Sequence, residues 1–144
     1  MKQATMRNER IALSVAISLS YLSAVADRFG LWGKTGESGV AWGNYKNFLD
    51  YTKHLNSWAP DSIIPILGGA ATGLEIILAI LLICNYERRF VATISGVLLS
   101  SFAVAMVLAD GIKGPFDYGV YTAIAASFLL AKIKDDGQME KASI

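Results

Sequence analysis

The chain has 144 residues, 53% of them hydrophobic and 17% charged, and its formal net charge at pH 7 is +1. This composition leaves too little polar surface for a soluble globule of this length, and the near-neutral charge excludes the strongly basic surface typical of nucleic-acid-binding proteins. Almost all of the charged residues fall in short segments between four apolar blocks. The pattern predicts one all-α domain over residues 1–144, a polytopic membrane protein with four transmembrane helices in a bundle.

The four expected transmembrane helices are residues 11–29, 63–84, 90–109 and 116–133. Each is close to the ~20 residues that cross a hydrocarbon core, and the first ends at a charged pair, Asp27 and Arg28, which we place at the membrane surface. An alternative interpretation of the first block is a secretory signal, because basic residues precede it and Ala24-Val25-Ala26 resembles a cleavage site. We retain the spanning helix.

Orientation follows from the positions of lysine and arginine. Eight of the thirteen basic residues lie in the N-terminal segment, the second connection and the tail: Lys2, Arg7, Arg10, Arg88, Arg89, Lys132, Lys134 and Lys141. The positive-inside rule therefore predicts that both termini are cytoplasmic, in a bacterial inner membrane, and that the loop over residues 30–62 lies outside.

The outer loop is expected to contain an interfacial helix. Asn44 is a candidate N-cap, and from Tyr45 to Asn56 apolar residues recur at helical spacing opposite charged ones. Its role is either a cap that keeps water out of the bundle or a lid over a ligand site. Four aromatic residues of this loop are candidate interfacial or partner-docking residues: Trp32, Trp42, Phe48 and Trp58.

Glu75 is the only charged residue in the second apolar block, and an ionisable group at such depth is costly unless it faces protein or enclosed water. Small residues share its helical face, and Gly69 with Gly73 forms a GxxxG step beside it, so we expect the carboxyl group to point into the bundle. Candidate hydrogen-bond partners at its depth are Ser18, Ser20, Tyr21, Ser100 and Ser101. Glu75 either handles protons or only joins helices through hydrogen bonds.

A second group of polar residues is expected at the outer end of the bundle. Its charged and phenolic members are Asp27, Arg28, Asp110, Lys113, Asp117 and Tyr118. With Tyr21 and Tyr121 they predict a polar pocket with apolar walls, the usual composition of a small-molecule site. The alternative is ordinary ion pairing between exposed loop charges.

The sequence offers few residues for redox or metal chemistry of its own. Cys84 is the only cysteine and His54 the only histidine. A dithiol cycle within one chain and a bis-histidine haem are therefore excluded, and we expect no metal centre and no covalently bound cofactor.

Several strings resemble the DoxX family, over about residues 10–132. They are Ala26-Asp27-Arg28-Phe29-Gly30-Leu31-Trp32-Gly33, the loop from Gly43-Asn44-Tyr45 to Trp58-Ala59-Pro60, Glu75, and Gly111-Ile112-Lys113-Gly114-Pro115-Phe116-Asp117-Tyr118. The resemblance implies a four-helix membrane bundle associated with membrane redox systems, in which quinone reduction is coupled to oxidation of sulfur compounds. Some related proteins carry paired cysteines, and because this chain has one cysteine, thiol chemistry is not carried over.

Three functional hypotheses remain open. The first is an accessory subunit of a membrane redox assembly that binds a quinone-like or lipid ligand between its helices and receives electrons from a partner. The second is a purely structural subunit of a larger membrane complex, or a homo-oligomer, in contact with membrane lipids. The third, a small-solute transporter, is disfavoured because no inverted repeat is visible.

Overall fold

The computed structural model describes residues 2–133, and the basic residues Lys134 and Lys141 lie outside this part. The described chain is all-helical, as predicted, without strands. Its helices are α1 (Lys2–Arg28), α2 (Tyr45–Leu55), α3 (Ile64–Ile83), α4 (Arg88–Asp110), α5 (Lys113–Asp117) and α6 (Val120–Lys132).

Within residues 2–133, three helices are long and apolar enough to cross a membrane. These are Met6–Arg28 within α1, together with α3 and α4. They correspond to the first three predicted spans, although α1 begins earlier in the sequence than the predicted helix. The chain therefore has the character of an integral membrane protein.

The fourth predicted span is not one continuous helix. The block over residues 116–133 is divided between the end of α5 and α6, with a break at Tyr118 and Gly119. Gly119 has φ +65°, a left-handed conformation that glycine adopts readily and that ends a helix. The 13 residues of α6 extend only about 20 Å at ~1.5 Å per residue, less than a hydrocarbon core about 30 Å thick.

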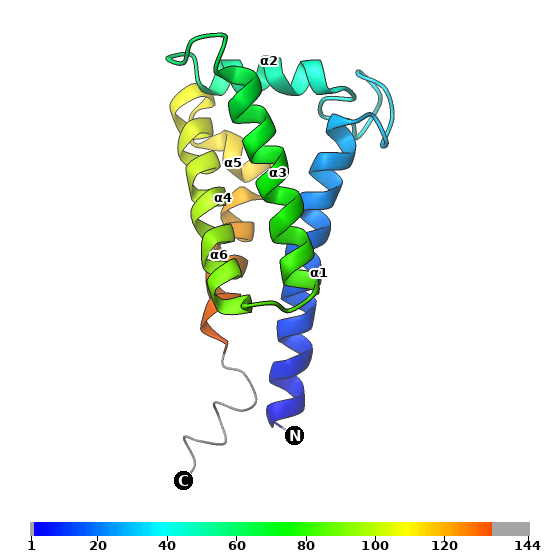
Figure 1. Cartoon of the computed structure of the whole chain (residues 1–144), viewed down its shortest axis with the longest axis vertical. Helices are drawn as coiled ribbons and strands as arrows, with labels where there is room; N and C mark the ends of the chain where they lie inside the picture. The colour runs from blue at the N-terminus through cyan, green and yellow to red at the C-terminus, as the bar shows by residue number, and fades with distance from the viewer. Residues whose placement is uncertain (1, 134–144) are drawn as a thin grey trace.

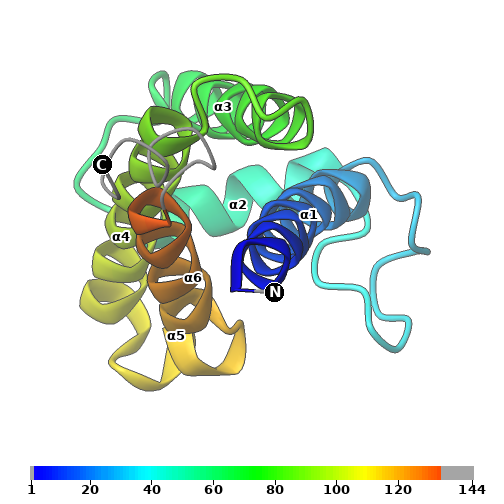
Figure 2. The same ribbon diagram turned by 90° about the horizontal axis from the view of Figure 1, so that it is seen from below.

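Helices α1, α3, α4 and α6 run roughly along the long axis, and α2 lies across one end, called here the α2 end (Figure 1). The start of α1 and the end of α6 lie at the opposite end. Seen along the long axis, the four helices surround a common centre and α2 crosses behind it (Figure 2). Buried apolar residues from all four form the core: Ile17, Tyr21, Leu78, Ala79, Leu82, Val91, Ala92, Leu99, Leu130 and Ala131.

The predicted helix in the loop is confirmed as α2. Asn44 caps it, because its side-chain oxygen accepts a hydrogen bond of 2.9 Å from the Asn47 amide. Phe48 and Thr52, on the apolar face, are buried against the bundle. This helix therefore covers the end of the bundle with the side that the helical spacing identified.

At the opposite end of the bundle, two arginines of α4 donate hydrogen bonds to carbonyl groups at the C-terminus of α6. Arg88 is buried and donates to the carbonyl groups of Leu130 at 2.6 Å and Ile133 at 2.9 Å, and Arg89 donates to that of Ala131 at 3.3 Å. Because the last carbonyl groups of a helix lack partners within the helix, these bonds satisfy them and fix α6 against α4.

The close approach between α2 and α3 depends on Gly68 rather than on the GxxxG step. A Cβ atom at Gly68 would meet the Leu49 side chain at 2.5 Å and the Phe48 ring at 3.2 Å, whereas one at Gly73 would meet nothing within 4 Å. Within this chain Gly69 and Gly73 make no such close approach, because a Cβ atom at Gly69 would meet only the Tyr45 hydroxyl group, at 4.0 Å.

We therefore expect Gly68→Val to destabilise the fold by about 1–3 kcal/mol, the usual cost of overpacking, because the new side chain must displace α2. Gly73→Val is the matched control, with the same gain of a β-branched residue in the same helix. The measurement is the difference in unfolding free energy between the two variants in detergent. Equal values would contradict the close approach.

Candidate ligand cavity and the buried ion pair

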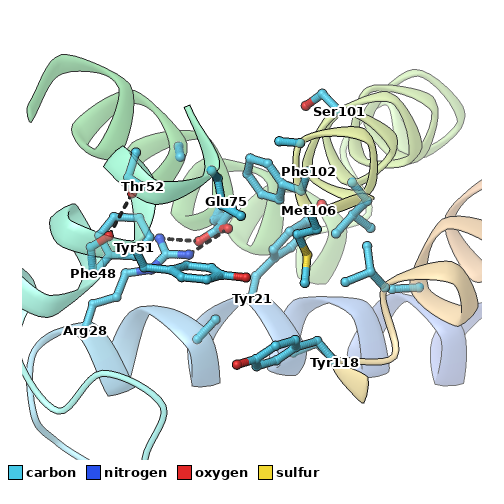
Figure 3. A pocket seen from close by; sticks show the side chains of 18 of the residues that line it. Tyr21, Arg28, Phe48, Tyr51, Thr52, Glu75, Ser101, Phe102, Met106 and Tyr118 are labelled. Atoms are coloured by element: carbon cyan, nitrogen blue, oxygen red, sulfur yellow. Dashed lines mark hydrogen bonds and ion pairs between the residues drawn. The ribbon is translucent and has the colours of Figure 1, made fainter. Parts of the chain in front are cut away.

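Glu75 lies inside the bundle, as predicted, and it is paired with a cation. The residue is 3% exposed, and its carboxylate faces the Arg28 guanidinium, with Nη2 2.9 Å from Oε1 and Nη1 2.6 Å from Oε2 (Figure 3). Arg28 Nη1 also donates to Thr72 Oγ1 at 2.9 Å. Arg28 itself is 3% exposed, so this is a two-point ion pair removed from solvent.

The partners proposed for Glu75 from its depth are wrong. Ser18 donates to the Ala79 carbonyl group at 3.0 Å, and Tyr21 shares a 2.7 Å hydrogen bond with Ser95. Three other serines satisfy carbonyl groups of their own helices: Ser20, Ser100 and Ser101. Arg28 is not an exposed charge at the end of α1, because its guanidinium group is turned into the bundle and is buried.

Two aromatic rings enclose the guanidinium group. The Arg28 Cζ atom lies 3.9 Å from the centre of the Phe48 ring and 5.4 Å from that of Trp42, distances at which a cation is attracted to a ring face. Phe48 is buried, so its assignment to a partner-docking surface is wrong. Trp42 is half-buried and contacts Arg28 with its ring, whereas Trp32 and Trp58 are exposed.

Asp27, next to Arg28 in the sequence, has a separate role. Its carboxylate accepts hydrogen bonds from the backbone amides of Ala41 at 2.7 Å, Trp42 at 3.1 Å and Gly43 at 2.9 Å. These bonds fix the loop to the end of α1 and hold Trp42 over Arg28. Asp27 therefore organises the cover of the site and does not line it.

A cavity of about 470 Å³ extends from the ion pair beneath α2. Most of its wall is apolar, and Figure 3 shows the paired Arg28 and Glu75 side chains beside α2. The lining side chains include Ile17, Tyr21, Arg28, Trp42, Phe48, Tyr51, Leu67, Ala71, Glu75, Leu99, Phe102, Ala105, Met106 and Tyr118. Three of the eight residues predicted for the polar pocket line this cavity: Arg28, Tyr21 and Tyr118. Glu75, which the sequence had assigned to a separate group, lines it as well.

The remaining members of the predicted polar group lie elsewhere. Tyr121 packs edge-on against Phe116, with ring centres 4.6 Å apart, and does not line the cavity. Lys113 and Asp117 form an exposed ion pair with each other, as the alternative interpretation anticipated.

Asp110 contacts two residues of α2 that were not predicted for this site. His54 Nε2 lies 2.5 Å from Asp110 Oδ1, and the Tyr51 hydroxyl group donates to Asp110 Oδ2 at 3.4 Å. Burial, followed by the charge of Asp110, raises the pKa of Tyr51 to about 12, so the phenol keeps its proton at neutral pH. The three-residue spacing of Tyr51 and His54, one helical turn, was the available sequence signal.

The arrangement favours an uncharged ligand. Arg28 and Glu75 compensate each other, so the cavity presents hydrogen-bonding groups and aromatic faces without a net charge. Among residues 2–133 no group of three His, Cys, Asp or Glu side chains could hold a metal ion. Cys84, which follows the last residue of α3, is exposed.

Comparisons of the chain with protein-family models, with curated proteins and with solved structures found no match. The likeness to the DoxX family therefore depends on the sequence strings quoted above.

Proposed function

We propose that this chain is a DoxX-like membrane protein that binds an uncharged ring-bearing lipid of the quinone class and serves as an accessory subunit of a membrane redox assembly. The observation that supports the proposal is the apolar cavity with the buried Arg28–Glu75 pair in its wall. A quinone head carries hydrogen-bonding oxygens on a flat apolar ring, which matches this combination of groups.

The size and the exits of the cavity suit such a ligand. Its volume of about 470 Å³ is within the range of small-molecule pockets, about 300–1,000 Å³. Two exposed residues, Ser20 on α1 and Tyr118 before α6, contribute to the lining. An isoprenoid tail would leave there toward the acyl chains while the head remains beside the ion pair.

The proposal includes an arrangement in the membrane. Helices α1, α3 and α4 span the bilayer, α5 and α6 together complete a fourth crossing, both termini are cytoplasmic, and α2 lies at the outer surface of a bacterial inner membrane. Electrons come from a partner subunit, because a quinone has to exchange electrons with a redox centre and the described residues offer no dithiol or metal cluster.

The test is to block the cavity. Ala71 lines it, whereas the neighbouring Ala70 is exposed and does not. We expect Ala71→Phe to weaken binding of a short-chain ubiquinone by at least about tenfold, because the new ring occupies the space of the head. Isothermal titration in mild detergent measures the affinity, and mass spectrometry of co-purified lipids identifies the native occupant.

Ala70→Phe controls for added hydrophobic bulk in the same turn of α3 and should bind as the wild type does. Absence of quinone binding by the wild type, or equal binding by both variants, would contradict the proposal.

The alternative of a structural subunit is supported by Leu31 and Trp58, each 77% exposed on loops near the α2 end. Under this alternative these side chains contact a larger complex, and Ala71→Phe co-purifies with that complex and supports its full activity. A loss of activity in an intact complex would instead favour the ligand-binding function.

A further inference from the structure

The contacts of His54, Asp110 and Tyr51 connect the cavity to the surface. The His54 side chain is 55% exposed and that of Asp110 34%, while Tyr51 lines the cavity. Figure 3 shows the Tyr51 ring extending from α2 into the cavity. The three side chains therefore form a continuous hydrogen-bonded row from the cavity to the protein surface at the α2 end.

We propose that His54, Asp110 and Tyr51 form a proton relay between the cavity ligand and the water at the α2 end. The proposal rests on the proposed function, since it needs a ligand whose oxygens gain or lose protons. It gives a role to the only histidine of the chain, which lies outside the cavity and contacts Asp110 of another helix.

The proton balance is simple. When a hydroquinone head gives two electrons to an electron acceptor of the assembly, it loses two protons, one at a time. Its hydroxyl proton passes to the Tyr51 oxygen as the phenolic proton passes to Asp110 Oδ2. At rest the Nε2–H group of His54 donates to Asp110 Oδ1, because a carboxylate oxygen can only accept. Once Asp110 is protonated at Oδ2, the exposed His54 ring exchanges with water to its Nδ1–H tautomer, and the carboxyl group turns about its Cβ–Cγ bond. Its proton then passes to His54 Nε2 while the Nδ1 proton leaves for water.

Each group returns to its starting state. Tyr51 stays neutral throughout, which agrees with its high pKa, and Asp110 is a carboxylate again after each transfer. His54 is again the Nε2–H tautomer once Nδ1 has released its proton to water. The reverse sequence delivers protons when a quinone is reduced.

The other titratable groups on the helices that carry the row have partners or positions of their own. Tyr118 lines the same cavity and acts electrostatically on Tyr51. On α5, Lys113 and Asp117 pair with each other. On α2, the pair Lys46–Asp50 is exposed. The row is therefore the hydrogen-bonded connection that the described residues provide between the cavity and the surface at His54.

The experiment uses the full chain in detergent loaded with decylubiquinol, with ferricyanide as the electron acceptor. One hydroquinone and two ferricyanide ions give one quinone, two ferrocyanide ions and two protons. Stopped-flow absorbance follows oxidation of the bound quinol, and an indicator dye in weak buffer follows proton release. The variants are His54→Ala, Asp110→Asn and Tyr51→Phe, with Asp50→Asn as the control on α2.

We expect each relay variant to slow proton release from the bound quinol by at least about tenfold, a modest loss for a positioned proton-transfer group. His54→Ala should bind decylubiquinol with the wild-type affinity, because His54 does not line the cavity. Added imidazole should restore most of its rate but leave Asp110→Asn slow. Asp50→Asn should behave as the wild type.

The outcomes separate the two proposals. If the wild type does not bind decylubiquinol, the proposed function fails and the relay fails with it. If binding is normal but the three variants release protons at the wild-type rate, the relay is wrong and the ligand-binding function stands. If His54→Ala is slow and imidazole does not restore it, His54 only supports the structure and the relay is overturned.

Discussion

Replacing Glu75 by alanine is expected to cost about 3–5 kcal/mol of folding free energy, the usual penalty for removing one partner of a buried ion pair. The cost arises because Arg28 would remain enclosed by Phe48, Trp42 and Thr72 without its counter-charge. Arg28→Met should cost a similar amount, because it leaves the carboxylate of Glu75 uncompensated. SDS titration in mixed micelles, followed by tryptophan fluorescence, measures both losses.

The double variant Arg28→Met/Glu75→Leu is the decisive comparison. Replacing both charges by apolar side chains of similar size removes the desolvation penalty together with the attraction, so most of the lost stability should return. If the double variant loses as much folding free energy as the two single variants together, the two groups do not interact.

The double variant also separates stability from function. It retains the apolar wall of the cavity but lacks the polar groups beside the ligand head. If the ion pair orients a quinone head, the folded double variant should bind short-chain ubiquinone more weakly than the wild type. Wild-type affinity would assign the pair to stability alone.

The burial of Glu75 could be predicted from its isolation in an apolar block, but its partner could not be predicted by counting depth along the helices. The Cα–Cβ bonds of a helix lean toward its N-terminus. Since α1 runs toward the α2 end and α3 runs away from it, Arg28 leans inward and Glu75 leans toward the α2 end. Both side chains are long, so they meet although their backbone positions suggest different depths.

Local patterns predicted α2 well, because the N-cap and the apolar face are encoded within its own residues. The inward position of Phe48 was missed because an apolar face can contact either lipid or protein, and the sequence of one helix does not distinguish them. The break before α6 was missed because Gly119 was treated as part of an apolar run rather than as a left-handed residue. The row from Tyr51 to Asp110 joins distant segments and depends on tertiary packing.

Asp27→Ala is expected to release the loop that covers the site. Hydrogen bonds to charged groups contribute about 1.5–3 kcal/mol each, and the Asp27 carboxylate accepts three from the amides of Ala41, Trp42 and Gly43. Their loss should increase hydrogen exchange at these three amides by at least about tenfold, through local opening rather than global unfolding. Hydrogen exchange followed by mass spectrometry measures the change.

Glu37→Gln provides the matched control, because Glu37 accepts one backbone amide, that of Lys34, in the same loop but at an exposed position. Its exchange pattern at residues 41–43 should match the wild type. The exchange rates of Asp27→Asn at residues 41–43 should lie between those of Asp27→Ala and Glu37→Gln, since an amide keeps one acceptor oxygen and loses the charge. Unchanged protection at residues 41–43 in Asp27→Ala would show that other contacts hold the loop.

The position of Asp27 beside Arg28 connects this prediction to ligand binding. The two residues are consecutive in α1. The Asp27 carboxylate holds the loop over residues 41–43 through hydrogen bonds, and the Arg28 guanidinium group holds α3 through its ion pair with Glu75. Trp42 belongs to both arrangements, because its amide binds Asp27 and its ring faces Arg28. Asp27→Ala should therefore speed the dissociation of a bound quinone without altering the cavity wall, and a stopped-flow dissociation rate equal to that of the wild type would show that α2 and its loop do not control access.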